Sequence, residues 1–219
     1  MEKLKQTFSN FYIDSSNKYV YEFLKNITDR KNDYSIVIIS GKNGIGKTHL
    51  MVALEENIKD KEKVIRISSQ YLKKKIIEQI KNENLDNLFN KIDILIIEDI
   101  QFLFSMERLE EEFYKLIRKF ASENKMVLMT IDKEKNTIKN IGLIKRIMKI
   151  DKSKSVILNI KPKITNKTKM KIIKDFNSIN HNNMTKNEIT ELAKKCNNFQ
   201  ELKNELNNKE ILFNVNNVI

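Results

Sequence analysis

The chain has 219 residues, 40% of them hydrophobic, which suits one domain of moderate size or one domain with a small appendage. Its lone cysteine, Cys196, excludes an intramolecular disulfide, and no apolar run reaches the ~18 residues of a membrane-spanning helix, so we expect a cytoplasmic protein without a membrane partner. The net charge of +12 favours a nucleic-acid partner only modestly, because the excess is nearly all lysine in a chain that is also rich in asparagine and isoleucine.

From residue 36 onward, apolar runs alternate with amphipathic stretches, which is typical of a parallel sheet covered by helices. We predict five strands, at 36–39, 64–67, 94–97, 126–130 and 156–160. We predict helices between them at 47–58, 70–81, 107–122 and 137–148, and helices alone after Pro162, at 166–178, 185–196 and 199–209. A capping box of Thr185 and Glu188 opens one of these helices. The pattern therefore predicts an α/β domain over residues 1–161 and a helical subdomain over residues 162–219.

Three of the four glycines lie within six residues, between the first predicted strand and the helix that follows it. Their G-x-x-x-x-G-K-[ST] spacing is typical of a loop whose backbone N–H groups bind phosphate. We expect Lys47 to reach the β- and γ-phosphates and the Thr48 hydroxyl to bind Mg²⁺; the alternative is a glycine-rich turn with an incidental Lys-Thr pair. The predicted nucleotide-binding residues are Gly41, Lys42, Asn43, Gly44, Ile45, Gly46, Lys47, Thr48 and His49.

The third predicted strand consists of four apolar residues and ends in two acids, Glu98 and Asp99. A buried strand that ends in carboxylates beside a phosphate-binding loop is the Walker-B arrangement. There, one acid holds Mg²⁺ and the next orients the attacking water. We assign the metal role to Glu98 and the water-orienting role to Asp99; the alternative is a strand that ends in solvated acids.

Three segments in this order resemble one known family. GKNGIGKTHL at 41–50, IEDIQF at 97–102 and TFSNFYIDSSN at 7–17 look like the AAA+ ATPase domain of the bacterial replication initiator DnaA. The resemblance extends from about residue 6 to residue 210. It implies a P-loop NTPase fold of the AAA+ type, with a five-stranded parallel sheet and a C-terminal helical lid. It also implies ATP or ADP with Mg²⁺ as ligands, and a role in the initiation of replication or in its control.

The resemblance carries two further roles onto this chain. Asp132 matches a sensor residue that follows the fourth strand, although an aspartate there also commonly caps the next turn. Arg146 matches an arginine that reaches the γ-phosphate held by a neighbouring subunit, although it is equally consistent with a solvated helix cation. With Glu98 and Asp99, these two residues complete the predicted catalytic set.

The chain departs from the family at three positions. Glu98 stands where the family has aspartate, Gly142 where it has a second arginine, and Gln200 where it has an arginine that senses the nucleotide. A glutamine cannot make the charge-assisted contact to a phosphate that arginine makes. We therefore expect nucleotide binding to persist, the difference between the ATP and ADP states to be weakened, and hydrolysis to be weak, if it occurs.

Two kinds of partner follow from the resemblance. The family holds single-stranded DNA with a helix inserted between the two phosphate motifs, where this chain has Lys73, Lys74 and Lys75; the alternative is a solvated helix face. The protein partner would be another copy of the chain or a full-length initiator. Longer members continue into a helix-turn-helix domain, so we expect no reading of duplex DNA by a chain that ends at Ile219. The other function classes are a nucleotide-binding regulator with little ATPase activity and a helicase loader.

Overall fold

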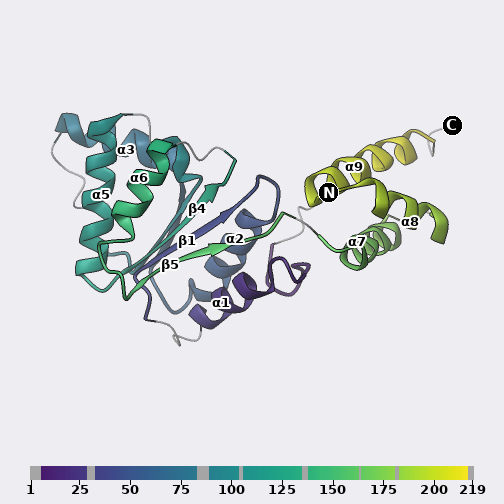
Figure 1. Cartoon of the computed structure of the whole chain (residues 1–219), viewed down its shortest axis with the longest axis horizontal. Helices are drawn as coiled ribbons and strands as arrows, with labels where there is room; N and C mark the ends of the chain where they lie inside the picture. The colour runs from purple at the N-terminus through teal and green to yellow at the C-terminus, as the bar shows by residue number, and fades with distance from the viewer. Residues whose placement is uncertain are drawn as a thin grey trace.

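A parallel β-sheet organises the first three-quarters of the chain (Figure 1). The structure is a computed structural model that describes residues 6–28, 33–82, 89–103, 106–134, 138–162, 164–180 and 183–216. In this part of the chain the sheet has five strands in the order β2-β3-β4-β1-β5, every pair parallel. The strands are β1 (Ile36–Gly41), β2 (Val64–Ser68), β3 (Ile94–Glu98), β4 (Met126–Asp132) and β5 (Ser155–Asn159). The five predicted strands and the α/β fold class are confirmed.

The seven predicted helices are also confirmed, with ends that shift by a few residues. The helices are α2 (Lys47–Ile58), α3 (Ser69–Asn82), α5 (Glu107–Ser122), α6 (Ile138–Ile147), α7 (Asn166–Ile179), α8 (Lys186–Lys195) and α9 (Phe199–Asn216). Residue 137, the predicted start of α6, lies outside the described residues. Helix α9 continues beyond the predicted residue 209.

In the described part of the chain, two elements were not predicted: helix α1 (Lys18–Thr28) and the short 3-10 helix η1 (Ile100–Leu103). In α1 the buried side chains are Val20, Phe23, Leu24 and Ile27. Their i, i+3, i+4, i+7 spacing is the amphipathic helix pattern. The signal was therefore present in the sequence, ahead of the region where strands and helices alternate.

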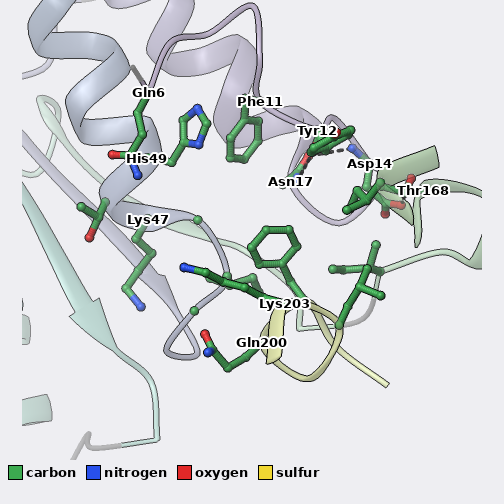
Figure 2. A pocket seen from close by; sticks show the side chains of 18 of the residues that line it. Gln6, Phe11, Tyr12, Asp14, Asn17, Lys47, His49, Thr168, Gln200 and Lys203 are labelled. Atoms are coloured by element: carbon green, nitrogen blue, oxygen red, sulfur yellow. Dashed lines mark hydrogen bonds between the residues drawn. The ribbon is translucent and has the colours of Figure 1, made fainter. Parts of the chain in front are cut away.

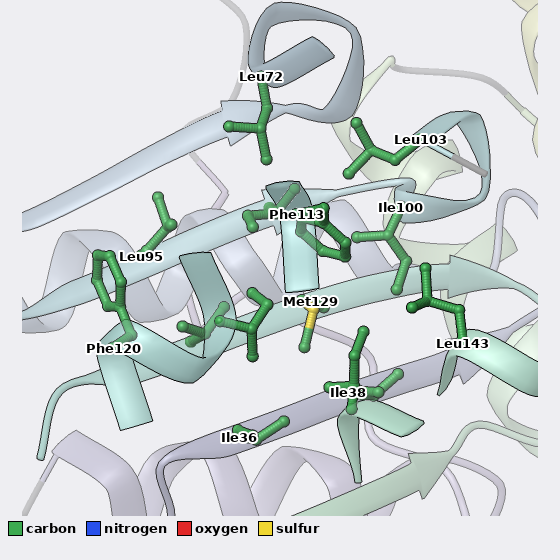
Figure 3. Close-up of a cluster of buried hydrophobic side chains, with 14 of the residues drawn as sticks. Ile36, Ile38, Leu72, Leu95, Ile100, Leu103, Phe113, Phe120, Met129 and Leu143 are labelled. Atoms are coloured by element: carbon green, nitrogen blue, oxygen red, sulfur yellow. The ribbon is translucent and has the colours of Figure 1, made fainter. Parts of the chain in front are cut away.

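The sheet separates two apolar clusters, because successive side chains of a strand point to opposite faces. Ile36 and Ile38 of β1 pack with α3, α5 and α6, around Phe113 and Phe120 (Figure 3). Val37 and Ile39, the alternating residues of β1, pack with α1 and α2 on the other face. The central strands β1, β3 and β4 are buried on both faces and read as continuous apolar runs, which is why these strands were predicted accurately.

Helices α7, α8 and α9 form a separate group beyond one end of the sheet, which we call the helical lid (Figure 1). They bury their own apolar cluster, including Ile173, Leu192 and Leu202. The predicted capping box at Thr185 and Glu188 is present. The division at residues 161 and 162 stays a prediction. No helix among the described residues is long and apolar enough to cross a membrane.

Candidate functional site

The loop between β1 and α2 has the backbone conformation that its glycines predict. Gly44 and Gly46 have φ angles of +73° and +98°, a region that side chains with a Cβ rarely adopt. Gly46 also precedes the first turn of α2, where backbone N–H groups lack partners within the helix and attract anions. The local sequence therefore folds into a loop that suits a phosphate group.

Lys47, the first residue of α2, directly follows this loop and is almost completely buried. Its ammonium group donates hydrogen bonds to the carbonyl oxygens of Gly41, at 2.8 Å, and Lys42, at 2.9 Å. Burial lowers the pKa of Lys47, and the carboxylates of Asp132 and Asp99 oppose that shift only in part. The three N–H donors of an ammonium exceed these two contacts, so a phosphate oxygen could also be bound.

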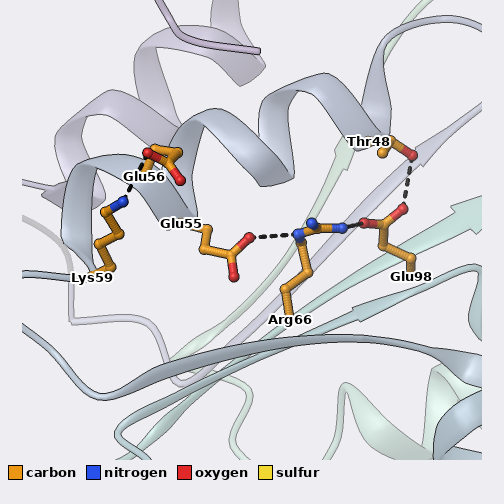
Figure 4. Close-up of polar contacts among 6 residues, drawn as sticks. All are labelled: Thr48, Glu55, Glu56, Lys59, Arg66 and Glu98. Carbon is orange, nitrogen blue, oxygen red and sulfur yellow. Dashed lines mark hydrogen bonds and ion pairs between the residues drawn. The ribbon is translucent and has the colours of Figure 1, made fainter. Parts of the chain in front are cut away.

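Thr48 and Glu98 meet, as the two phosphate motifs predict. The Thr48 hydroxyl donates to Oε2 of Glu98 at 2.8 Å, and the other oxygen, Oε1, accepts from Arg66 (Figure 4). No group of three or more His, Cys, Asp or Glu residues that could hold a metal exists in the described part of the chain. One hydroxyl and one carboxylate nevertheless fit Mg²⁺, which proteins usually bind through one or two carboxylates together with substrate phosphates. Thr48 and Glu98 are thus the residues that would hold it.

Asp99 and Asp132 are linked at the carboxyl ends of β3 and β4. Gln101 joins them, because its Nε2 donates to Asp99 Oδ1 at 3.3 Å and its Oε1 accepts from the Asp132 backbone N–H at 3.1 Å. Asp99 has a φ of +58°, a conformation that is uncommon for a residue other than glycine. Sequence reasoning missed the bridging role of Gln101, because a glutamine near an acid pair has no motif of its own.

The buried carboxylate of Asp132 accepts a hydrogen bond from the Glu134 N–H at 3.0 Å. This is the contact that the alternative reading, a cap on the following turn, predicts. The register of the sheet also pairs Asp132 with Gly41, at the start of the phosphate loop. Asp132 therefore lies beside the loop and caps a turn; its sensor role stays a prediction.

A cleft of about 540 Å³ opens beside the phosphate loop, between the sheet domain and the helical lid. Figure 2 shows Lys47 on one side, and Gln200 and Lys203 of α9 on the other. Gln200 lies directly over the loop: a Cβ added to Gly44 would stand 2.1 Å from its Oε1. The glutamine at this departure from the family pattern thus faces the phosphate loop with an uncharged amide.

The segment before α1 forms the third side of the cleft, which sequence reasoning did not predict. The Phe11 ring lies against Gly46, where an added Cβ would stand 2.9 Å from it, and packs edge-on against His49 at 5.1 Å between ring centroids. His49 Nε2 also lies 2.9 Å from the Thr7 carbonyl oxygen. His49, which we expected to bind nucleotide, therefore contacts this segment, and no finding tests the expected role.

Asp14 connects the same segment to the lid. Its Oδ2 accepts from the Thr165 N–H and hydroxyl and from the Thr168 hydroxyl, at 3.0, 2.7 and 2.7 Å, while Oδ1 accepts from the Ser16 N–H at 3.0 Å. Burial alone would raise the pKa of Asp14, but the hydrogen bonds from Thr168, Thr165 and Ser16 outweigh it and hold that pKa below its usual range. The carboxylate is thus held ionised at the start of α7.

Arg146 does not line this cleft, as expected for a residue that acts on a neighbouring subunit. Its guanidinium forms a bidentate ion pair with Glu111 of α5 and lies 4.0 Å from the centroid of the Tyr114 ring. The side chain is 46% exposed. The added Cβ at Gly142, one turn earlier in α6, would meet nothing within 4 Å. The exposed position suits both readings of Arg146.

The three lysines predicted to meet DNA lie in the first half of α3. Lys74 is exposed, whereas Lys75 forms an ion pair with Glu78 at 2.8 Å and lies 5.8 Å from the Tyr71 ring centroid. Leu72 and Ile76 anchor the helix in the core. The triplet therefore includes an intrahelical pair, which the solvated-face alternative predicts, together with an exposed cation and an exposed aromatic ring.

Comparison with structures that are already solved shows the fold. A replication initiator DnaA bound to AMPPCP and single-stranded DNA superposes with a TM-score of 0.77 at 24% identity, over 94% of this chain and 64% of that one. Domain III of the Thermotoga maritima initiator gives 0.74 at 20% identity, over 92% and 86%. The DnaC helicase loader gives 0.58 at 14%, over 72% and 98%. The AAA+ fold class is confirmed.

Comparison of sequences identifies the family. A family model described as the bacterial DnaA ATPase domain matches residues 3–150. The chromosomal replication initiator DnaA of Campylobacter jejuni is 32% identical over 187 residues, which are 81% of this chain and 42% of that protein. The corresponding protein of Sulfurimonas denitrificans is 31% identical over 85% of this chain and 43% of its own length. The chain thus spans about two-fifths of these relatives, and it belongs to the bacterial DnaA ATPase-domain family.

Proposed function

We propose that this chain binds ATP or ADP, together with Mg²⁺, in the cleft between the phosphate loop and the helical lid. The observation that carries the proposal is the loop itself. Two left-handed glycines lead into α2, and Thr48 at its first turn contacts Glu98 at the end of β3. A relative of the same fold binds the ATP analogue AMPPCP. In this proposal Lys47 binds the β- and γ-phosphates, and Thr48 and Glu98 hold the metal.

The proposed biological role is in the initiation of bacterial DNA replication or in its control, in the cytoplasm. Subunits would assemble with a nucleotide of one facing Arg146 of the next. The partner is either a second copy of this chain or a full-length initiator. Hydrolysis requires a water oriented by Asp99, and we expect it to be weak, because Gln200 faces the phosphate loop without the positive charge that stabilises a transferring phosphate.

A second candidate is a regulator that binds nucleotide structurally and acts by occupying an initiator interface. The uncharged residues at Gly142 and Gln200 favour it. A helicase loader shares the fold, but the sequence relatives are initiators. Single-stranded DNA is a proposed ligand of Lys73, Lys74 and Lys75, supported by the relative that binds it and by the exposed ring of Tyr71 beside them.

Nucleotide titration tests the first step of the proposal. We expect Lys47→Ala to weaken binding of a fluorescent ATP analogue by at least about a hundredfold, because it removes a charge-assisted contact to the phosphates. Lys59→Ala is the matched control, because it also removes a lysine charge from α2, but at the far end of the helix, where Lys59 pairs with Glu56 at 3.0 Å. If Lys47→Ala binds as tightly as the wild type, the phosphate-loop assignment is wrong.

Light scattering with ATP, ADP or no nucleotide, each with and without single-stranded DNA, tests the second step. ATP-dependent assembly that is lost in Arg146→Ala would support the initiator-like mechanism. Lys145→Ala, which alters the exposed neighbouring cation of α6, is the control. A monomer that does not respond to nucleotide would contradict the mechanism. Assembly only with a full-length initiator would favour the regulator.

A further inference from the structure

Arg66 of β2 joins the predicted metal ligand to helix α2, and no motif of the sequence points to it. Its Nε donates to Oε2 of Glu55 at 2.6 Å, and its Nη1 donates to Oε1 of Glu98 at 2.6 Å (Figure 4). Glu98 is already bonded to Thr48 through its other oxygen. Both oxygens of the carboxylate are thus held, one by the phosphate loop and one by Arg66.

The sheet and α2 fix this geometry. In the parallel register of β2 and β3, Arg66 pairs with Ile96 and Ser68 pairs with Glu98. Arg66 and Glu98 therefore point to the same face of the sheet. That face carries α2, because Ile94 and Ile96 pack in the same apolar cluster as the α2 side chains. Glu55, one turn before the end of α2, then faces the guanidinium.

The three side chains are also partly shielded from water. The exposed fractions are 31% for Arg66, 27% for Glu55 and 13% for Glu98. A guanidinium presents its N–H donors in a rigid plane, so it can bind two carboxylates at once in fixed directions. An ammonium on a flexible stem would hold one of them less directionally.

We propose that Arg66 is a positioning residue of the metal site: by holding Oε1 of Glu98, it directs Oε2 toward Thr48 and toward the Mg²⁺ that accompanies the nucleotide. The inference rests on the proposed function. Glu98 replaces the aspartate of the family and has one more side-chain torsion, so it has more rotamers to restrict. Arg66 supplies the restriction that a shorter side chain would not require.

The charges of the cluster allow this role. An arginine beside a metal ligand would repel Mg²⁺ if its own charge were not compensated. Here Glu55 binds Nε of the same guanidinium, so Glu55, Arg66 and Glu98 together carry one negative charge. The metal therefore meets a cluster with the net charge of a single carboxylate, in a fixed orientation.

The test measures the affinity of a fluorescent ATP analogue over a series of Mg²⁺ concentrations, with an EDTA arm. In Arg66→Gln we expect the Mg²⁺ concentration of half-maximal effect to rise about tenfold, the usual scale for losing a partner of a metal ligand, with unchanged affinity in EDTA. In Arg66→Lys, which keeps the charge, that Mg²⁺ concentration should rise less. The matched control is Lys59→Gln, which removes one positive charge from the end of α2, where Lys59 pairs with Glu56 at 3.0 Å (Figure 4).

A double-mutant cycle separates positioning from charge. In a Glu98→Asp background the shorter carboxylate no longer reaches Arg66, so adding Arg66→Gln should change the half-effect concentration by less than about twofold. A fall or no change in that concentration for Arg66→Gln alone would overturn the inference. Circular dichroism checks folding, and if Arg66→Gln fails to fold, Arg66→Lys decides with the same readout.

Two outcomes separate the inference from the proposed function. If nucleotide binding by the wild type does not depend on Mg²⁺, both the inference and the proposed metal site are wrong. If the wild type depends on Mg²⁺ and Arg66→Gln shows the same dependence, the inference alone is wrong.

Discussion

One wall of the cleft is continuous in sequence, whereas the facing wall is assembled from distant segments. The first wall is formed mainly by residues 43–49, from the loop that follows β1 to the first turn of α2. In the second wall, Asp14 bonds to Thr165, which is 151 residues away. Tyr12 likewise donates to Asp175 of α7 at 3.1 Å, across 163 residues.

The two walls are therefore stabilised by different interactions: local backbone conformation in the first, and contacts between distant segments in the second. The phosphate loop follows from backbone conformation that a few neighbouring residues decide, above all the left-handed glycines. The junction between the segment before α1 and the lid depends on the buried Asp14 and on half-buried or exposed partners that become its neighbours only when the chain folds. A buried carboxylate that loses its donors, or donors that lose it, cost more free energy than a surface pair of the same geometry. We thus expect the loss of the buried Asp14 carboxylate at this junction to have the largest effect on stability.

The largest expected effect comes from Asp14→Ala. It leaves the Thr165 and Thr168 donors without their buried acceptor at the start of α7. We expect the free energy of unfolding to fall by about 3 kcal/mol, measured by urea denaturation. Ser15→Ala is the matched control, because the exposed Ser15 hydroxyl is the weakest donor to Asp14, at 3.2 Å, and its loss should change stability by less than about 0.5 kcal/mol. Equal losses for the two variants would contradict the role of Asp14.

The stability difference between the wild type and Asp14→Ala should also depend on pH. Because the folded pKa of Asp14 lies below its usual value, the ionised carboxylate stabilises the folded state. That contribution is complete above about pH 5 and is lost as the pH falls from the unfolded pKa of ~4 toward the lower folded one. The stability difference between wild type and Asp14→Ala should shrink over this range. A difference that stays constant in acid would contradict it.

The contrast between the walls also explains what the sequence could predict. The strands, most of the helices and the meeting of Thr48 with Glu98 were predicted, because each depends on local patterns or on strand ends that share one edge of a parallel sheet. The Asp14 contacts, Phe11 on the loop and the Arg66 bridge were not predicted. They are pairs of ordinary residues that become neighbours only through the tertiary fold, and no spacing along the chain marks them.

Gly44→Ala tests the contact between the phosphate loop and Gln200 of the helical lid. Its φ of +73° is strained for alanine, and the new methyl would collide with Gln200 of the lid. We expect the free energy of unfolding to fall by about 1–2 kcal/mol from the strain alone. A further loss from the collision should be recovered in Gly44→Ala with Gln200→Ala.

Gly142→Ala makes the same chemical change where an added Cβ meets nothing within 4 Å, on an exposed turn of α6. It should raise stability by about 0.5–1 kcal/mol, because glycine loses more backbone freedom in a helix. If Gly44→Ala is as harmless as Gly142→Ala, the loop does not require its left-handed glycine. If adding Gln200→Ala to Gly44→Ala restores no stability, Gln200 does not contact the loop closely enough to exclude the new methyl group.

A smaller loss of stability than in Asp14→Ala or Gly44→Ala is expected from Tyr12→Phe, which removes one hydrogen bond of the junction and keeps the ring. We expect the free energy of unfolding to fall by about 1 kcal/mol at neutral pH, whereas Tyr19→Phe, on a side chain that is 67% exposed, should change it little.

Burial, together with the hydrogen bond to Asp175, raises the pKa of Tyr12 to about 12. A raised folded pKa means that the neutral phenol stabilises the fold, fully below the unfolded value of ~10 and less as the pH rises toward the folded one. The difference between wild type and Tyr12→Phe should therefore vanish over this alkaline range, and a difference that grows there would mean that Tyr12 does not donate to Asp175.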